Sequence, residues 1–168
     1  MKIIIDTREQ RPFDFSAFGA EAMTGNLLTG DYSIFGMENI ITVERKELSD
    51  ILNCLGSERP RFFRELERLK SYEGAAIVIE SPLSVIAAGR YRSRISPQSA
   101  VQSLIAIQAQ FRLPIFFAKD RTDAEAYVFH FLRHFQNMIE RRYRACCIGN
   151  DEKVMPNNKP CRTAQKEG

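Results

Sequence analysis

The sequence predicts an α/β fold in three layers, with a central mixed β-sheet flanked by helices. Two patterns lead to this prediction. A predicted β-hairpin is followed by alternating strands and helices, and residues 75–80 form a nearly continuous apolar run, as in a strand buried on both faces. The length of 168 residues suits one domain, and 44% hydrophobic with 27% charged residues is ordinary for a globular protein. Disordered, fibrous and membrane-integral proteins are therefore excluded.

The amino-terminal part is predicted to hold a strand, a hairpin and a short helix. The short apolar run at residues 2–6 indicates a buried strand, which a polar and aromatic loop follows. Residues 30–35 and 40–44 are rich in β-branched and aromatic residues and flank a turn-like segment, so they predict a hairpin. A helix over residues 48–55 comes next, and Gly56 ends it.

The rest of the chain is predicted to alternate helices with buried strands. Amphipathic spacing predicts a helix over residues 61–72, ahead of the buried strand at 75–80. A second buried strand is expected over residues 113–118, and a capping-box match from Thr122 to Glu125 opens the last helix. Two Ser-Pro pairs look like an N-cap followed by proline at the first helical position, the second opening a helix to about residue 112; they are Ser81-Pro82 and Ser96-Pro97.

One domain over residues 1–143 is expected, followed by a flexible tail over residues 144–168, which contains prolines and lacks apolar periodicity. No apolar run approaches the roughly 20 residues that span a membrane, and the amino-terminal run is too short for a signal peptide. The four cysteines are unevenly spaced and are expected to be free thiols. These features predict a cytoplasmic protein.

Charge is unevenly distributed, although the net charge is only +3. Residues 81–119 contain no acidic residue but five basic ones, whereas acids gather in the first third of the chain and in the helix after Gly56. This separation favours one surface for a polyanion and another that holds a cation. Chance segregation in a folded chain is the alternative.

The predicted hairpin brings three charged residues together. Asp31 begins one strand and Glu44 ends the other, so the two carboxylates are expected to meet at one edge of the sheet. Lys46 shares the face of Glu44, because residues two apart on a strand point the same way. Two such carboxylates repel each other unless a cation lies between them, and Mg²⁺ prefers oxygen ligands. The arrangement favours metal-assisted phosphodiester hydrolysis, while a solvated strand edge with ion pairs is the alternative.

Three motifs in order resemble the signature of the XPF-type structure-specific endonucleases. The family pattern is D-x-R-E, then G-D-Y or G-D-F, then E-R-K-x-x-x-D. In this chain the three motifs are Asp6-Thr7-Arg8-Glu9, Gly30-Asp31-Tyr32 and the segment from Glu44 to Asp50. The resemblance covers about residues 2–143 and implies a restriction-endonuclease-like fold. It is greatest to the small stand-alone nucleases of bacteria and their phages.

The resemblance implies a Mg²⁺- or Mn²⁺-dependent DNA endonuclease acting at branched, flap or junction DNA. Asp31 and Glu44 match the metal-binding carboxylates, with the Arg45 carbonyl as a backbone ligand, and Lys46 matches the catalytic lysine. The residues that border or complete the pocket, by direct contact or by structural support, are Asp6, Arg8, Glu9, Arg45 and Asp50. Family members also dimerise, so a homodimer or a heteromeric partner that supplies structure specificity is a further implication.

Residues 89–94 alternate arginines with a tyrosine in the acid-free region. If the protein is a nuclease, Arg90, Arg92 and Arg94 are expected to contact DNA phosphates, and Tyr91 to stack on a base. An exposed loop with solubilising arginines is the alternative. For the protein as a whole, a DNA-binding or scaffold subunit without catalysis is a second hypothesis, and RNA is an alternative substrate. The pathway, whether repair, recombination or phage genome processing, stays open.

Overall fold

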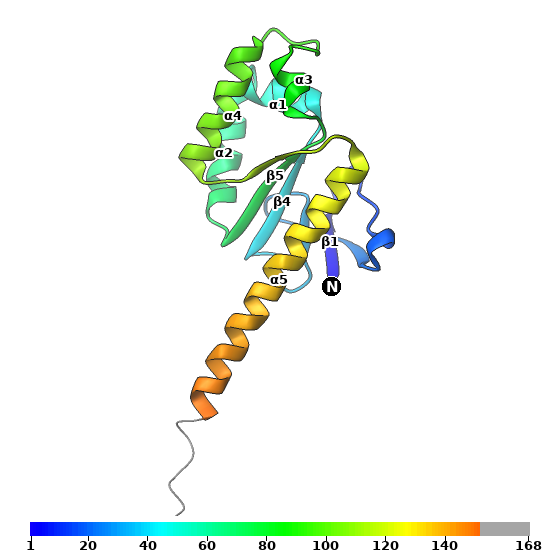
Figure 1. The fold of residues 1–168 in the computed structure, drawn as a ribbon, viewed down its shortest axis with the longest axis vertical. Coiled ribbons are helices and arrows are strands. Elements are labelled where there is room, and N and C mark those ends of the chain that lie inside the picture. The colour runs from blue at the N-terminus through cyan, green and yellow to red at the C-terminus, as the bar shows by residue number, and fades with distance from the viewer. Residues whose placement is uncertain (152–168) are drawn as a thin grey trace, which may run out of the picture. The chain divides into compact units, whose positions relative to one another are not determined.

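The structure, a computed structural model, describes residues 1–151, which contain a six-stranded mixed sheet with helices on both faces (Figure 1). The strand order is β2-β1-β3-β4-β5-β6, and only β3 runs antiparallel to its neighbours. The predicted three-layer α/β fold and the predicted hairpin are confirmed. The strands are β1 (Lys2–Asp6), β2 (Glu21–Gly25), β3 (Tyr32–Ile34), β4 (Ile41–Lys46), β5 (Gly74–Ile79) and β6 (Ile115–Phe117).

The helices cover the two faces of the sheet unequally. The first part of α5 packs on one face, where Tyr127 stacks on Phe116 of β6 at a ring distance of 3.9 Å. The other four helices lie on the opposite face, where Leu66, Ile77 and Leu104 are almost completely buried. The helices are α1 (Leu48–Leu55), α2 (Arg59–Lys70), α3 (Leu83–Ala87), α4 (Pro97–Phe111) and α5 (Arg121–Asp151), besides a 3₁₀ turn at Ser16–Phe18.

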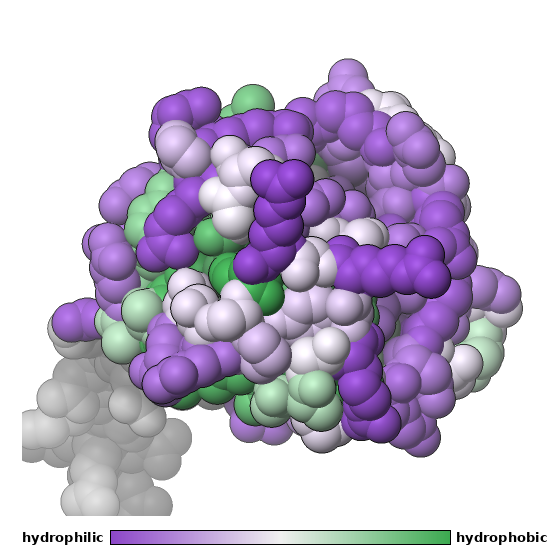
Figure 2. Space-filling view, turned by 90° about the horizontal axis from the view of Figure 1, so that it is seen from above, coloured by the Kyte–Doolittle hydropathy of each residue, from purple (hydrophilic) through white to green (hydrophobic). Residues whose placement is uncertain are grey.

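Strands β4 and β5 are parallel, so their carboxyl ends lie at the same end of the sheet, next to the start of α1 and α3. Every residue of β5 is buried, as its apolar run predicts. Figure 2 looks onto this end of the molecule from above, and most of the side chains on view are hydrophilic. Polar groups at the ends of these strands are therefore available for chemistry.

Two elements differ from the prediction at the edges of the sheet. Strand β2 was not predicted, because it lies at an edge, pairs only with β1, and keeps Glu21 and Thr24 exposed. A buried strand was predicted over residues 113–118, but β6 (Ile115–Phe117) is only half-buried, because it forms the opposite edge. An edge strand needs less apolar sequence than a central one, which explains the weak pattern of β2.

Two helix starts also differ from the prediction. Pro82 is the N-cap of α3 rather than its first helical residue. The capping box of α5 is not Thr122 with Glu125: the Asp120 carboxylate accepts from the Asp123 N–H at 2.8 Å, two residues earlier. Aspartate caps as well as threonine does, so sequence alone left the register open. Ser96 does cap α4 as predicted, accepting from the Ser99 N–H at 3.2 Å.

The chain divides into two units, Met1–Gln136 and a second that begins at Asn137. The first holds the sheet, and the described part of the second is the rest of α5, which continues to Asp151 beyond the predicted domain end at Tyr143. Residues 152–168 of the predicted tail, with Cys161, lie outside the described residues. The other three cysteines are free thiols, and no helix within residues 1–151 is long and apolar enough to cross a membrane.

Candidate active site

The β3–β4 hairpin brings Asp31 and Glu44 together as the sequence predicts. The Asp31 N–H donates to the Val43 carbonyl at 2.8 Å, and the Asp31 carboxylate accepts from the Arg45 N–H at 2.7 Å. Gly30 permits this close approach: its φ is +85°, and a Cβ there would lie 1.9 Å from the Thr42 hydroxyl. Glu44 is only 6% exposed and Asp31 is half-buried, so a carboxylate pair forms at the end of β4.

Two further groups join this carboxylate pair. The Lys46 ammonium contacts a carboxylate oxygen of Glu44, as their shared strand face predicts. It also donates to Glu65 of α2 at 3.0 Å. We call Asp31, Glu44, Lys46 and Glu65 the acidic cluster. Glu65 was not among the predicted site residues. Its only signal is its place beside the apolar stripe of α2, one residue before buried Leu66.

The acidic cluster shifts the pKa values of its members. Burial raises the pKa of Asp31 to about 6, with the charges of Glu9 and Glu65 adding to the effect. Burial, and then the charge of Asp31, raise the pKa of Glu44 well above its ordinary value. Burial alone would lower the pKa of Lys46, but the neighbouring Glu44 and Glu65 charges outweigh it and raise that pKa. Lys46 is therefore a cation, and the carboxylates resist carrying their charge without a counter-ion.

This arrangement fits a hard divalent ion. Within residues 1–151, no three His, Cys, Asp or Glu side chains converge as ligands of one metal ion. Magnesium, however, is commonly held by one or two carboxylates, with water and substrate phosphate oxygens completing its coordination. Asp31 and Glu44 supply that donor set. A cation bound between them would favour their charged forms and so lower the pKa values that burial raises.

The D-x-R-E motif divides between support and cleft. Asp6 is 2% exposed and accepts hydrogen bonds from the Arg8 N–H, the Arg8 guanidinium and the Leu27 N–H, at 2.6–3.1 Å. It acts as the anchor of this loop. Arg8 and Glu9 instead line a cleft of about 550 Å³ together with Asp31 and Glu44. The sequence left contact and support open for this motif, and the structure places Asp6 in a supporting position.

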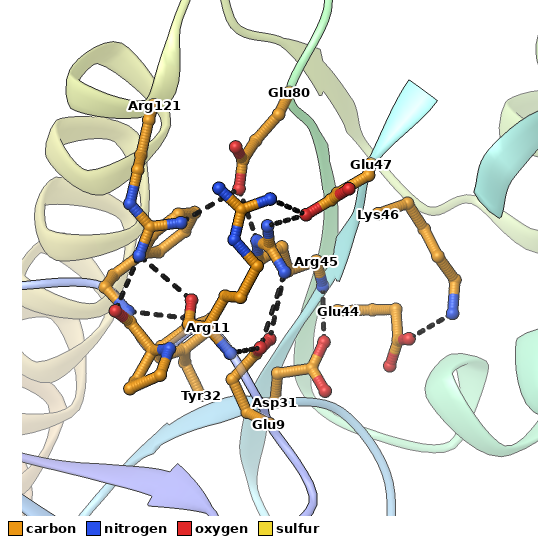
Figure 3. A network of polar contacts seen from close by, with 12 residues as sticks. Glu9, Arg11, Asp31, Tyr32, Glu44, Arg45, Lys46, Glu47, Glu80 and Arg121 are labelled. Carbon is orange, nitrogen blue, oxygen red and sulfur yellow. Dashed lines mark hydrogen bonds and ion pairs between the residues drawn. The ribbon is translucent and has the colours of Figure 1, made fainter. Parts of the chain in front are cut away.

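Arg45 points to the other side of β4 from Lys46 and joins a second set of charges (Figure 3). Its guanidinium contacts the carboxylate of Glu80, which follows β5, that of Glu47 at 2.8 Å, and that of Glu9 at 3.4 Å. Arg121 lies next to Glu80, at 3.6 Å. We call Glu9, Arg11, Arg45, Glu47, Glu80 and Arg121 the arginine network, since Arg11 also contacts Glu47, at 2.6 Å. Four of them, Arg11, Glu47, Glu80 and Arg121, were not predicted as site residues.

The cleft opens between the loop after β1 and helices α1 and α2. Asp50 of α1 lines it but is exposed, and its carboxylate accepts from the Ser49 hydroxyl at 3.4 Å. Three arginines with largely exposed guanidinium groups also line the cleft: Arg8, Arg11 and Arg61. A negative floor is thus bordered by positive charge, which suits a phosphodiester backbone above a metal ion.

The predicted DNA-binding residues lie apart from this cleft. Residues 90–94 connect α3 to α4, and none of them lines it. Arg90, Arg92 and Arg94 are exposed, whereas Tyr91 is half-buried against the core and donates to the Ile95 carbonyl at 3.1 Å. The arginines keep their predicted accessibility, but the ring of Tyr91 is engaged in packing.

Comparisons with known proteins identify the family of this chain. The ERCC4 domain matches residues 5–131. No protein with a curated description matches the sequence. XPF from Aeropyrum pernix is structurally similar, with a TM-score of 0.67 and 24% identity over 86% of this chain and 69% of that one. A second structure, XPF from Aeropyrum pernix in complex with DNA, gives 0.65 and 26% over 81% and 65%. The chain belongs to the ERCC4 domain family of nucleases and spans about two thirds of the length of those XPF chains.

Proposed function

We propose that this protein is a metal-dependent DNA endonuclease that hydrolyses phosphodiester bonds, acting at branched, flap or junction DNA. The observation that carries the proposal is the acidic cluster, in which buried Glu44 and half-buried Asp31, both with raised pKa values, lie beside a lysine in an open cleft. Membership of a nuclease family supports it, as does the DNA complex of the Aeropyrum XPF.

In this proposal, Asp31, Glu44 and the Arg45 carbonyl hold Mg²⁺ or Mn²⁺. An ion held there would supply Lewis-acid chemistry, polarising a phosphate oxygen and making a coordinated water more acidic. Lys46, whose pKa is raised, keeps its proton and therefore acts as a hydrogen-bond donor, which orients the water or neutralises charge on the phosphate. Arg8, at the mouth of the cleft, contacts the nucleic-acid backbone. We expect a 5′-phosphate and a 3′-hydroxyl as products.

The experiment is cleavage of a labelled panel of single strand, duplex, 3′ flap, fork, four-way junction and single-stranded RNA. Each substrate is incubated with Mg²⁺, Mn²⁺ or EDTA. Glu44→Gln is the test variant, and Glu67→Gln, an exposed glutamate on α2, is the matched control. Metal-dependent cutting that is lost only in Glu44→Gln supports the proposal, and the preferred substrate identifies the structure recognised.

Other outcomes favour the alternatives. Tight DNA binding without cutting, unchanged by Glu44→Gln, indicates a non-catalytic binding or scaffold subunit of a nuclease complex. Cleavage of RNA in preference to every DNA substrate would assign the same chemistry to another nucleic acid. Cutting that persists in EDTA contradicts the role given to Asp31 and Glu44.

A further inference from the structure

Arg121, the first residue of α5, reaches back to the loop that follows β1. One of its guanidinium nitrogens, Nη2, donates to the carbonyl oxygens of Arg11 at 2.9 Å and of Pro12 at 2.6 Å. A guanidinium presents several donors in a fixed plane, so it can hold two carbonyls at once. The loop thus has an anchor more than a hundred residues away in the sequence.

The other terminal nitrogen of Arg121 faces the rest of the arginine network. Nη1 lies 3.6 Å from Oε1 of Glu80, and the same oxygen accepts from Nε of Arg45. Among the residues that the structure describes, this nitrogen is buried without a hydrogen-bond partner. It therefore acts on Glu80 through charge alone, and Glu80, only 12% exposed, is held between two cations. Glu80 in turn fixes the side chain of Arg45.

Phe13 completes the connection between the loop and the sheet. Its ring is 3% exposed and lies under the guanidinium groups of both Arg121, at 4.9 Å, and Arg45, at 5.5 Å. It stacks on Tyr32 of β3 at 5.0 Å, and its N–H donates to the Tyr32 hydroxyl at 3.0 Å. The next N–H, of Asp14, donates to Glu125 of α5 at 3.1 Å.

From this geometry we infer that Arg121 is a positioning residue for the reaction proposed above, although it does not itself line the cleft. It fixes the segment from Glu9 to Phe13, which carries Glu9 and Arg11 into the cleft wall, and through Glu80 it fixes Arg45. Arg45 lies between Glu44 and Lys46 in the chain, and its N–H holds the Asp31 carboxylate. Arg121 therefore positions both the loop that forms the cleft wall and the carboxyl end of β4.

The test compares Arg121→Met, Arg121→Lys and the control Arg133→Met, which removes an exposed arginine from the same helix. Hydrogen exchange is measured on the Phe13 and Asp14 amides, and kcat and KM on the best substrate, at a temperature where every variant is folded by circular dichroism. For Arg121→Met we expect exchange about tenfold faster or more at both amides. We also expect kcat to fall about 10–100-fold with KM changed less than about threefold. Arg121→Lys should recover part of both effects, because an ammonium can still donate to the two carbonyls.

Three results would overturn the inference. One is unchanged exchange at Phe13 and Asp14 in Arg121→Met. Another is faster exchange with kcat within twofold of wild type, and the third is a loss of kcat that Arg133→Met matches. If the wild-type protein cuts no substrate, the proposed function fails and the role in that reaction fails with it. The exchange experiment then still decides whether Arg121 holds the loop.

Discussion

Strand β4 separates two groups of charges that differ in how well they are balanced. On one side, the acidic cluster sets the carboxylates of Asp31, Glu44 and Glu65 against the single ammonium of Lys46, and two of these acids have raised pKa values. On the other side, the arginine network gives every carboxylate a guanidinium partner. There, hydrogen bonding to Arg45, followed by nearby positive charge, lowers the pKa of Glu47.

This difference indicates that the acidic cluster serves function and that the arginine network supports the fold. A network in which carboxylates and guanidinium groups balance supports the fold and leaves no excess charge for a ligand to neutralise. An unbalanced group costs stability and is relieved by protonation or by a bound cation, so it is the better candidate for the metal. The two groups meet at one strand, because Glu44 and Lys46 of β4 point to one side and Arg45, between them, points to the other.

The largest effect should come from neutralising an acid of the acidic cluster. We expect Asp31→Asn to lower the rate of metal-dependent cleavage at least about 100-fold while raising the melting temperature of the metal-free protein. The asparagine oxygen can still accept from the Arg45 N–H, so the fold is retained. Single-turnover kinetics and calorimetry test this, with Glu9→Gln as the matched change in the arginine network. A rise in melting temperature for Glu9→Gln as well would remove the distinction between the two sides.

Arg45→Met should produce the largest loss of stability. Removing this guanidinium takes away the guanidinium contact of Glu9 and leaves Glu80 with Arg121 alone. Breaking a buried ion pair from one side costs about 3–5 kcal/mol. Urea denaturation measures the change in the free energy of unfolding, and Arg61→Met, at an exposed position, is the control. A loss below about 1 kcal/mol would show that the arginine network does not stabilise the fold as proposed.

The stability of the metal-free protein should depend on pH through Asp31. Its pKa is raised from 3.8 to about 6, so the folded state binds more protons than the unfolded state between these values. The free energy of unfolding is therefore expected to fall as pH rises from about 4 to 7, by about 1–3 kcal/mol from this group. Mg²⁺ at pH 7.5 should restore it, because the metal replaces the proton. Thermal melts across this range test both parts, and a stability that does not respond to Mg²⁺ contradicts the metal site.

The smallest effect concerns the loop at residues 90–94. Replacing Arg90, Arg92 and Arg94 together by glutamine should leave the melting temperature unchanged. If the loop contacts a single strand, the slope of log K against log salt should fall by about 0.7 per phosphate lost. Tyr91→Phe should instead cost about 1 kcal/mol of stability through the lost bond to the Ile95 carbonyl, with no change in binding. Fluorescence anisotropy titrations distinguish these results, and an unaltered slope in the triple variant would favour a merely solubilising loop.

The hairpin and its carboxylates could be predicted because they depend on local rules. A period of two fixes the shared face of Glu44 and Lys46, and the short turn fixes Asp31 opposite the end of β4. Glu65, Glu80 and Arg121 could not be predicted in this way. They reach the site through the packing of α2, β5 and α5. No local sequence pattern predicts which distant residue such a charged side chain will contact. The same limit hid β2, whose exposed edge needs no apolar pattern.

Gly30 has a consequence for how mutational data on this protein would read. A side chain at this position would collide with Thr42, and the positive φ would strain the backbone of any other residue. In a saturation mutagenesis screen scored by activity, Gly30 should therefore tolerate substitution as poorly as Asp31, although it offers the substrate no functional group. Parallel scoring by protein abundance would separate the two positions, with Gly30 variants depleted and Asp31 variants retained.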